Sequence, residues 1–230
     1  MHDLFKGLLN IIYPLSCGAC GGSGDALCKP CIDTFRPVDQ NDSCPVCGRC
    51  LGQRIVCGHC ADEKRTFDEG LYGFYFENKL REAVHAFKFT GRKDVGRRLV
   101  GLARKNIIPF SSKFDCIVPM PVTEKRLKNR GFNQSFIVAE EISGITGKPL
   151  YHSVLRKTKE TQDQYSLARE ERRKNVQGVF ALFDSHKIRD SRVLLVDDLY
   201  TTGATAREAS RTLMKGKTKS VVLFALARTP

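Results

Sequence analysis

The chain has 230 residues, of which 41% are hydrophobic, and its formal net charge is +13. This length fits one main domain plus a smaller module, and the apolar content is sufficient for a packed core. The longest purely apolar run, 221–227, is far shorter than the roughly 20 residues that a membrane helix needs, so we expect no membrane span.

The first element expected along the chain is a short amphipathic helix, because Leu4, Phe5, Leu8, Leu9 and Ile12 recur at helical spacing. We expect this helix to pack on the protein's own core rather than on a membrane surface. The same stretch has neither a basic n-region nor a small-residue cleavage site. We therefore expect no secretory signal and a cytoplasmic location.

Cysteines dominate the next part of the chain, since nine of the ten lie between residues 17 and 60. Eight of them form C-x-x-C pairs, a spacing that lets two thiolates of one tight turn reach the same tetrahedral ion. The pairs are Cys17 with Cys20, Cys28 with Cys31, Cys44 with Cys47, and Cys57 with Cys60. Four pairs predict two zinc sites, which are structural because four cysteines leave no position for a reacting water.

Other uses of these cysteines are disulfides or a thioredoxin-like redox pair. Zinc is favoured because a reducing compartment is expected and because a redox site needs only one pair. Sequential use of the pairs places the first two on one ion and the last two on the other. An interleaved arrangement, joining first with third and second with fourth, stays open. Cys50 and His59 are expected to be bystanders.

A change in composition near residue 66 predicts two domains, a zinc-ribbon-like module at 1–66 and a larger domain at 67–230. The module holds 7 Lys or Arg and 7 Asp or Glu, whereas the larger domain holds 31 and 18. The whole positive excess therefore lies in the larger domain. Such an excess attracts phosphates, nucleic acid or anionic surfaces, although a merely soluble basic surface is the alternative.

The larger domain shows apolar strands that alternate with helices. We expect a strand or hairpin at 67–76, helices at 78–89 and 94–105, a buried strand at 116–119, a helix at 132–145, a buried strand at 193–196, a helix at 205–215 and a buried strand at 220–227. Cys116 is expected to be a small core residue. Continuous apolar strands between helices predict an α/β fold with a parallel sheet that helices cover on both faces.

The stretch V-L-L-V-D-D-L-Y-T-T-G-A-T, residues 193–205, predicts a ligand site, because ligands bind beyond the carboxyl ends of parallel strands. We expect the strand to end at Val196 and the chain to turn into a helix near Thr205. Asp197 and Asp198 suit a vicinal diol or Mg²⁺, and the turn offers amides and hydroxyls to a phosphate. Together they predict a ribose 5-phosphate site, and an ordinary capped strand–turn–helix is the alternative.

This stretch resembles the phosphoribosyl pyrophosphate (PRPP) motif of type I phosphoribosyltransferases. The whole chain resembles the ComF family of competence proteins, most closely its ComFC members. The resemblance covers the cysteine module, P-M-P at 119–121, R-G-F-N-Q at 130–134, the segments 156–167 and 171–176, and the two-aspartate motif.

The resemblance implies a type I phosphoribosyltransferase-like domain in a cytosolic protein of natural transformation that handles incoming single-stranded DNA. It implies that Asp197 and Asp198 hold the ribose hydroxyls of PRPP. The 5-phosphate would lie on Thr201, Thr202, Gly203, Ala204 and Thr205, and the pyrophosphate beside Pro119, Met120 and Pro121.

The P-M-P loop lacks the glycine and the basic residue that phosphoribosyltransferases often carry there. The nearest cations come later, at Lys125, Arg126, Lys128 and Arg130. Transfer chemistry needs the charge of the leaving pyrophosphate to be neutralised. Binding without turnover therefore stands beside Mg²⁺-dependent transfer of phosphoribose to an unknown acceptor. Further candidates for the pocket wall are Arg130, Gln134, Arg172 and Asn175.

Basic clusters in the larger domain are candidates for contact with nucleic acid. They comprise Lys125, Arg126, Lys128, Arg156, Lys157, Lys159, Arg172, Arg173 and Lys174, in segments that also hold Phe132, Tyr151 and Tyr165. A cationic groove with aromatic faces suits single-stranded DNA, although each cluster alone fits a solvated helix face. The polar segment 156–174 is expected to be a mobile loop that closes over the sugar-phosphate site.

Three functions remain open at this stage. The first is a DNA-handling competence factor that binds a ribose phosphate or a DNA end. The second is a phosphoribosyltransferase. The third is a scaffold in which the zinc module docks a partner such as a helicase of the DNA-uptake machinery.

Overall fold

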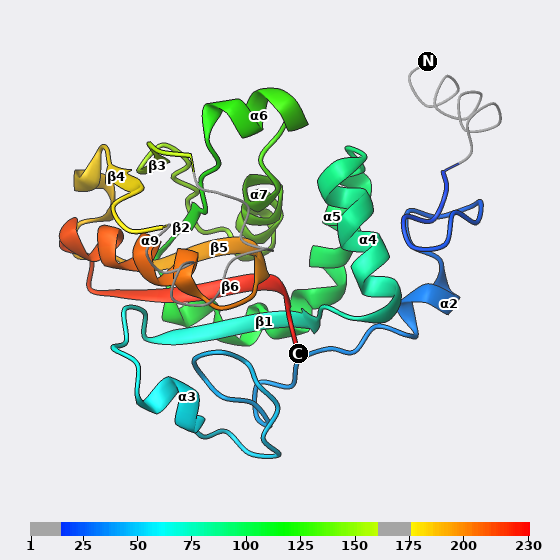
Figure 1. Ribbon diagram of the computed structural model, residues 1–230, viewed down its shortest axis with the longest axis horizontal. Helices are drawn as coiled ribbons and strands as arrows, with labels where there is room; N and C mark the ends of the chain where they lie inside the picture. Colours follow the sequence, from blue (N-terminus) through cyan, green and yellow to red (C-terminus); the bar gives the residue numbers. More distant parts are fainter. Residues whose placement is uncertain (1–14, 161–175) are drawn as a thin grey trace.

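A four-stranded parallel sheet forms the centre of the protein in the computed structural model, which describes residues 15–160 and 176–230. Its strands are β1 (Glu69–Tyr75), β2 (Cys116–Pro119), β5 (Arg192–Tyr200) and β6 (Ser220–Arg228), in the order β1-β6-β5-β2 (Figure 1). All three pairings are parallel. The predicted α/β fold with a parallel sheet is confirmed, and the helix predicted at the N-terminus lies outside the described residues.

Helices cover both faces of the sheet. The longer helices are α4 (Asn78–Phe89), α5 (Lys93–Leu102), α7 (Gln134–Thr146) and α9 (Ala204–Lys215). Shorter elements are α2 (Lys29–Ile32), α3 (Gly58–Ala61), α6 (Glu124–Arg130), the 3₁₀ turns Ala103–Asn106, Ile108–Lys113 and Ser185–Ile188, and the antiparallel pair β3 (Leu155–Lys157) and β4 (Phe180–Leu182). None of the helices in the described ranges is long and apolar enough to cross a membrane.

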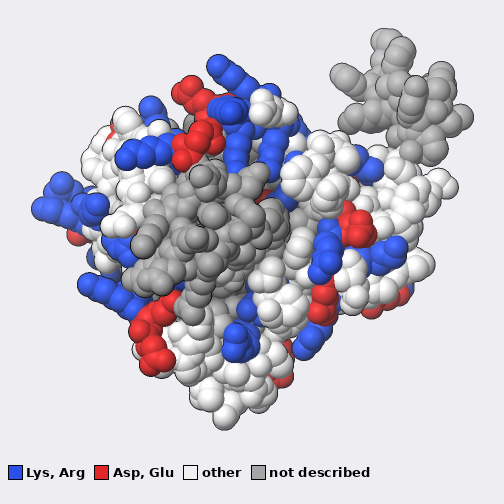
Figure 2. All heavy atoms as spheres, in the orientation of Figure 1, with Lys and Arg blue, Asp and Glu red and all other residues white. Residues whose placement is uncertain are grey.

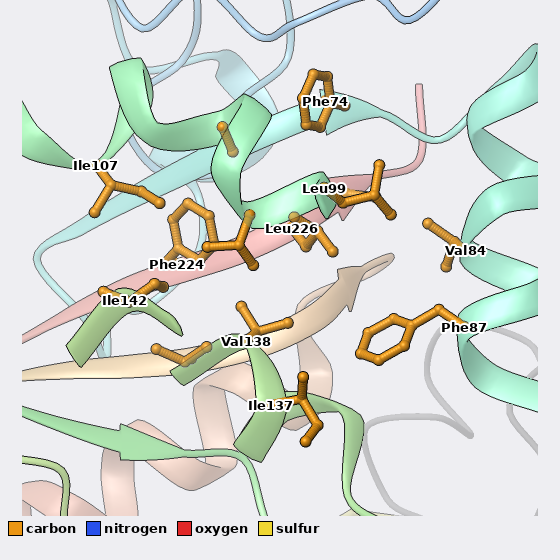
Figure 3. Close-up of a cluster of buried hydrophobic side chains, with 14 of the residues drawn as sticks. Phe74, Val84, Phe87, Leu99, Ile107, Ile137, Val138, Ile142, Phe224 and Leu226 are labelled. Atoms are coloured by element: carbon orange, nitrogen blue, oxygen red, sulfur yellow. The ribbon is translucent and has the colours of Figure 1, made fainter. Parts of the chain in front are cut away.

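Each face of the sheet has its own apolar core, because successive side chains of a strand point to opposite faces. Leu194 and Val196 face α4, α5 and α7, where they pack with Phe87, Leu99 and Val138. Figure 3 shows this cluster, with side chains of the three helices meeting those of β6. The opposite face carries Val193 and Leu195 toward α9, β3, β4 and part of the cysteine module.

The strand that carries the two aspartates is longer than the sequence predicts. It does not end at Val196 but stays paired with β6 as far as Tyr200, which lies opposite Arg228. Asp197 and Asp198 therefore lie within the strand, near its carboxyl end, and not in the turn that follows it. The expected end of the strand was wrong because the apolar run marks only its fully buried portion, whereas pairing with β6 continues beyond it.

Several short elements have no counterpart among the predicted ones, and α6, β3 and β4 lie closest to the candidate site. The sequence of α6, E-K-R-L-K-N-R, shows no apolar stripe, and the helix is defined instead by its ends. Thr123 accepts a hydrogen bond from the Arg126 amide, and Gly131 ends the helix at a φ of +75°. Strands β3 and β4 are too short for a periodic pattern to show.

Irregular chain covers both edges of the sheet. Along β1, the Val38 amide donates to the Gly73 carbonyl at 3.0 Å and the Tyr75 amide donates to the Arg36 carbonyl at 2.9 Å. Along β2, the Ile117 amide donates to the Pro149 carbonyl at 2.9 Å. Strand edges that pair in this way are closed to further strands.

Candidate functional site

The eight paired cysteines form two clusters. In each cluster the Sγ atoms of four cysteines lie within 4.8 Å of one another, and the pairs are used sequentially: Cys17, Cys20, Cys28 and Cys31 in the first, Cys44, Cys47, Cys57 and Cys60 in the second. The favoured sequential pairing is thus confirmed. Cys50 and His59 belong to neither cluster.

The sulfur spacing fits zinc. Cys20 and Cys28 place their Sγ atoms 3.7 Å apart, and so do Cys47 and Cys57. Four sulfurs at a Zn–S distance of about 2.3 Å around a tetrahedral ion lie about 3.8 Å from one another. Backbone amides also point at the sulfurs, since the Cys57 amide donates to Cys44 Sγ at 3.4 Å. Both clusters are therefore structural zinc sites with four thiolate ligands.

The second cluster is attached to β1 at the underside of the sheet, close to α3 in Figure 1. The Tyr72 hydroxyl donates to the Val46 carbonyl at 2.6 Å, and the Gly70 amide donates to the Pro45 carbonyl at 2.8 Å. Gly48 lies so close to the Tyr72 ring that a Cβ there would be 2.4 Å from a ring carbon. The ribbon and the strand are thus packed as one unit.

The paired aspartates lie at the carboxyl end of β5 and are both half-buried. Asp197 Oδ1 accepts hydrogen bonds from the Ser135 hydroxyl at 3.1 Å and from the Asp198 amide at 2.8 Å. Asp198 Oδ2 lies 2.9 Å from Lys88 Nζ. Burial, together with the neighbouring Asp198 carboxylate, raises the pKa of Asp197 to about 7. The two acids therefore differ, because Asp198 forms an ion pair with Lys88, whereas Asp197 is held by the Ser135 hydroxyl and the Asp198 amide.

The turn that follows β5 is arranged to receive an anion. Gly203 has a φ of +74° and caps α9, whose first amides have no acceptor within the helix. Within the described part of the chain, the amides of Thr201, Thr202 and Gly203 donate to no acceptor. The Thr202 hydroxyl oxygen is buried and likewise has no partner among the described residues. This donor group lies at the positive end of a 12-residue helix.

The R-G-F-N-Q motif and the serine after it connect the parts of this site. Asn133 Nδ2 donates to the Met120 carbonyl at 3.0 Å, which fixes the P-M-P loop. Gln134 Nε2 donates to the Lys88 carbonyl at 3.2 Å. Ser135 holds Asp197, as described above. Three successive residues at the start of α7 therefore position the loop, the end of α4 and the first aspartate.

Lys88 and Ser135 are site residues that sequence reasoning missed. Ser135 directly follows the quoted motif, so its position next to Gln134 is a signal that could have found it. Lys88 lies in an ordinary amphipathic helix, and only the packing of α4 brings it to Asp198. It places a positive charge 2.9 Å from the Asp198 carboxylate.

Several predicted pocket residues use their side chains within the protein. Met120 is 5% exposed and Gln134 is 2% exposed, so Met120 offers a ligand only its backbone. Arg130 donates to Gln134 Oε1 at 3.4 Å, and its guanidinium lies over the Phe89 ring at 5.1 Å. Pro119 ends β2, and Pro121 is half-buried after it.

The described candidates for nucleic-acid contact lie on α6, on β3 and directly after β3. Lys125 and Lys128 are exposed on α6, where Figure 2 shows Lys and Arg side chains gathered at the top of the view. Burial and the Arg126 charge lower the pKa of Lys157 to about 8. Arg156 and Lys159 are exposed. The candidates Arg172, Arg173 and Lys174, with Asn175 and most of the predicted mobile loop, lie outside the described residues.

Known proteins resemble the chain in both parts. Residues 8–61 match the double zinc ribbon domain. Competence protein F of Haemophilus influenzae is 27% identical over 89% of this chain and 91% of its own length. Competence protein ComFC of Bacillus subtilis is 27% identical over 89% of this chain and 85% of its own. The chain is a homologue of these competence proteins.

DNA utilization protein YhgH of Escherichia coli K12 is 24% identical over 94% of this chain and 94% of its own length. Among solved structures, a purine phosphoribosyltransferase from Pyrococcus horikoshii is 18% identical, covers 58% of this chain and 81% of its own, and has a TM-score of 0.36. Adenine phosphoribosyltransferase from Leishmania tarentolae is 14% identical over 62% and 74%, with a TM-score of 0.38.

Proposed function

We propose that this protein acts in the use of DNA taken up by the cell, and that its larger domain binds a phosphorylated ribose, PRPP in particular. The homologues named as competence and DNA utilization proteins support the first part. One observation carries the second part. Two carboxylates and a turn with unused amide and hydroxyl donors lie at the same end of β5.

The chemistry of a ribose 5-phosphate matches this arrangement. Asp197 and Asp198 accept hydrogen bonds from the two ribose hydroxyls, and the amides of 201–203 donate to the phosphate. The carboxylate of Asp198 also suits a Mg²⁺ ion, which would offset the charge of a bound diphosphate. Lys88 supplies a positive charge beside Asp198, and the P-M-P loop itself has none.

Titration with PRPP, with and without Mg²⁺, tests this site by calorimetry. We expect saturable binding by the wild type and a loss on the order of a hundredfold in the double variant Asp197→Asn with Asp198→Asn, since each carboxylate loses charged hydrogen bonds. Glu82→Gln, an exposed acid on α4, is the matched control. Equal affinity in the wild type and the double variant would refute the assignment.

Lys88 has a test of its own. Lys88→Met removes the charge beside Asp198 while it keeps the length of the side chain, so PRPP affinity should fall and Lys88→Arg should restore part of it. An unchanged affinity in Lys88→Met would show that the lysine serves only the ion pair with Asp198.

Phosphoribosyl transfer is the second candidate, and the presence of Lys88 favours it because the charge of a leaving pyrophosphate has to be neutralised. The acceptor is not defined by the described residues. The measurement is release of pyrophosphate from PRPP and Mg²⁺ across a panel of nucleobases and amines. Binding of PRPP with no release across the panel would leave the site as a binding site alone.

Single-stranded DNA in the cytoplasm is the nucleic acid that we propose for the basic domain. The net charge of +13 lies entirely in the part after residue 66 and supports electrostatic binding. Affinity should fall with salt, with a log–log slope of about −0.7 for each phosphate contacted. An affinity that stays flat between low and physiological salt would exclude such contacts.

Docking of a protein partner, such as a helicase of the uptake machinery, is a further candidate for the zinc module. Residues 20–25 of the first ribbon are all exposed, so none of their side chains is buried against the sheet or its helices. Asp25→Lys would weaken capture of the helicase if this loop is the contact. Unchanged capture would place the contact elsewhere.

A further inference from the structure

A second cleft, separate from the two aspartates, lies between α6, α7 and β3. Its volume is about 560 Å³. The rings of Phe132, Phe136 and His152 line it, together with apolar Leu127 and the cations Lys93 and Arg156. Neither the aspartates nor the hydroxyl-rich turn contributes to its lining. Pro119 and Pro121 do line it, so the cleft adjoins the proposed ribose-phosphate site on the side of the P-M-P loop without containing the two aspartates.

The three rings of the cleft differ in exposure, since Phe132 is buried, Phe136 is half-buried and His152 is exposed. The Phe136 and His152 rings meet edge to face, with centroids 5.8 Å apart and planes at 87°. The Phe132 ring has Lys93 Nζ 5.2 Å from its centroid. Among the described lining residues, Glu124 is the only one with a carboxylate. The cleft is thus aromatic inside and mainly cationic at its rim.

Two exposed phenylalanines continue this surface beyond the cleft. Phe183 is 41% exposed, and the guanidinium of Arg156, itself a lining residue, lies 4.1 Å from its ring centroid. Phe89 is 54% exposed and has Arg130 over its ring at 5.1 Å. Each of these exposed rings has a guanidinium over it, and ring and guanidinium planes are surfaces on which the bases of a single strand stack.

The alternation of rings and cations matches one class of partner. Bases of a single strand stack on aromatic faces and on guanidinium planes, while the phosphates between them contact nearby cations. A small sugar phosphate would use the cations but not the rings. A duplex would hide the faces of its bases. The exposed lysines Lys125 and Lys128 lie on α6, the helix that lines the cleft with Glu124 and Leu127.

We infer that this surface binds single-stranded DNA by base stacking, with one base in the cleft and flanking bases on the Phe183–Arg156 and Phe89–Arg130 pairs. The inference rests on the proposed binding of single-stranded DNA and adds the place and the manner of that binding. It separates the DNA site from the ribose-phosphate site, so that the two ligands bind side by side.

Fluorescence anisotropy with a labelled oligo-dT of about 15 nucleotides, at low salt, tests the location. Phe136→Ala and Phe183→Ala should each weaken binding about fivefold or more, as expected when one stacked base is lost. Ile55→Ala, which removes a 48% exposed apolar side chain in the second ribbon, is the matched control and should bind as the wild type does. Circular dichroism and a zinc content of two per chain verify that each variant is folded.

An abasic oligonucleotide of the same length tests the manner of binding. The wild type should prefer the strand with bases, and Phe183→Ala should lose part of that preference, whereas a variant that is only less stable would weaken both strands equally. Binding that ignores the bases, or ring variants that match Ile55→Ala, overturns the inference and leaves electrostatic DNA binding intact. A wild type that binds neither strand overturns the DNA proposal itself, while the PRPP titration reports separately on the ribose-phosphate site.

Discussion

The two zinc sites share one motif but differ in what they are packed against. In the first, Cys20 is exposed and Cys28 half-buried, and the ribbon lies against α4 and α5. In the second, all four ligands are buried, and the ribbon covers the underside of β1 around Tyr72. Identical C-x-x-C spacing therefore leads to a partly exposed site in one case and to a fully buried site in the other, although each ribbon joins one of the two cores.

The contacts of the two ribbons with the rest of the chain differ in the same way. The first is attached through a side chain, since the Arg92 guanidinium donates to the Ser16 carbonyl at 2.6 Å. The second is attached through the sheet itself, by the bonds of Tyr72 and Gly70 to the Pro45–Val46 turn. We therefore expect loss of the second metal to damage the whole fold, and loss of the first to remain local.

The largest expected effect is that of Cys60→Ser, which removes a ligand of the second site. Zinc content should fall from two ions to one, and the free energy of unfolding should fall by roughly 4–5 kcal/mol or more, as for other losses of a metal. Metal analysis and denaturant unfolding measure both quantities. Cys50→Ser, in the same ribbon but outside both clusters, is the control.

Next comes Gly48→Ala, compared with Gly18→Ala in the first ribbon. At Gly48 the backbone has a φ of +68°, and a Cβ would lie 2.4 Å from the Tyr72 ring, so overpacking and backbone strain add to about 3 kcal/mol. At Gly18 a Cβ would meet the end of the Val95 side chain at 2.6 Å, with no left-handed backbone. We expect the smaller loss there, and the reverse order in thermal unfolding would contradict the comparison.

A smaller effect is expected from Cys20→Ser, at the exposed corner of the first site. One zinc ion should again be lost, but the free energy of unfolding should fall by only about 2 kcal/mol, within the usual range for one substitution. The sheet should keep its circular dichroism spectrum. If Cys20→Ser unfolds the chain as fully as Cys60→Ser, the two sites are equivalent and the distinction fails.

The smallest effect concerns pH. The Arg92 guanidinium lowers the pKa of the Asp94 carboxyl, so ionised Asp94 stabilises the folded state at pH values above about 3.9, the ordinary value for an aspartate. This contribution is lost as the pH falls through the lowered folded-state pKa. The melting temperature of the wild type should thus be slightly higher than that of Asp94→Asn at pH 6, and this difference should disappear below about pH 4. A gap independent of pH would point to packing instead.

The zinc sites and the sheet could be predicted because their signals are local. Each C-x-x-C pair lies on one turn, and the strands at 116–119, 193–196 and 220–227 are continuous apolar runs that the structure confirms. The extension of β5 through Asp198 could not be predicted, because pairing with β6 rather than composition decides it. Helix α6 has no apolar stripe, so its caps, not its periodicity, define it.

The candidate site was predictable in its residue types and not in its connections. The aspartates and the hydroxyl-rich turn follow each other in the sequence and lie at one end of β5, as expected. Lys88 reaches Asp198 through tertiary packing, in which Gln134 of α7 donates to the Lys88 carbonyl, and the two residues of the ion pair are 110 positions apart in the chain. The two ring–arginine pairs beside the second cleft depend on packing in the same way. Arg156 on β3 meets Phe183, which follows β4, and Arg130 on α6 meets Phe89 on α4.

The N-terminal part of the chain supplies the irregular segment that pairs with the edge of β1. This pairing keeps the edge from pairing with another copy of the protein. A fragment that begins at residue 67 would present an unpaired strand edge and a bare apolar underside, and bare edges recruit strands from other copies. Shortage of zinc would uncover the same surface without any cut in the chain. The amount of this protein that stays dispersed in a cell should therefore follow the supply of metal during its synthesis.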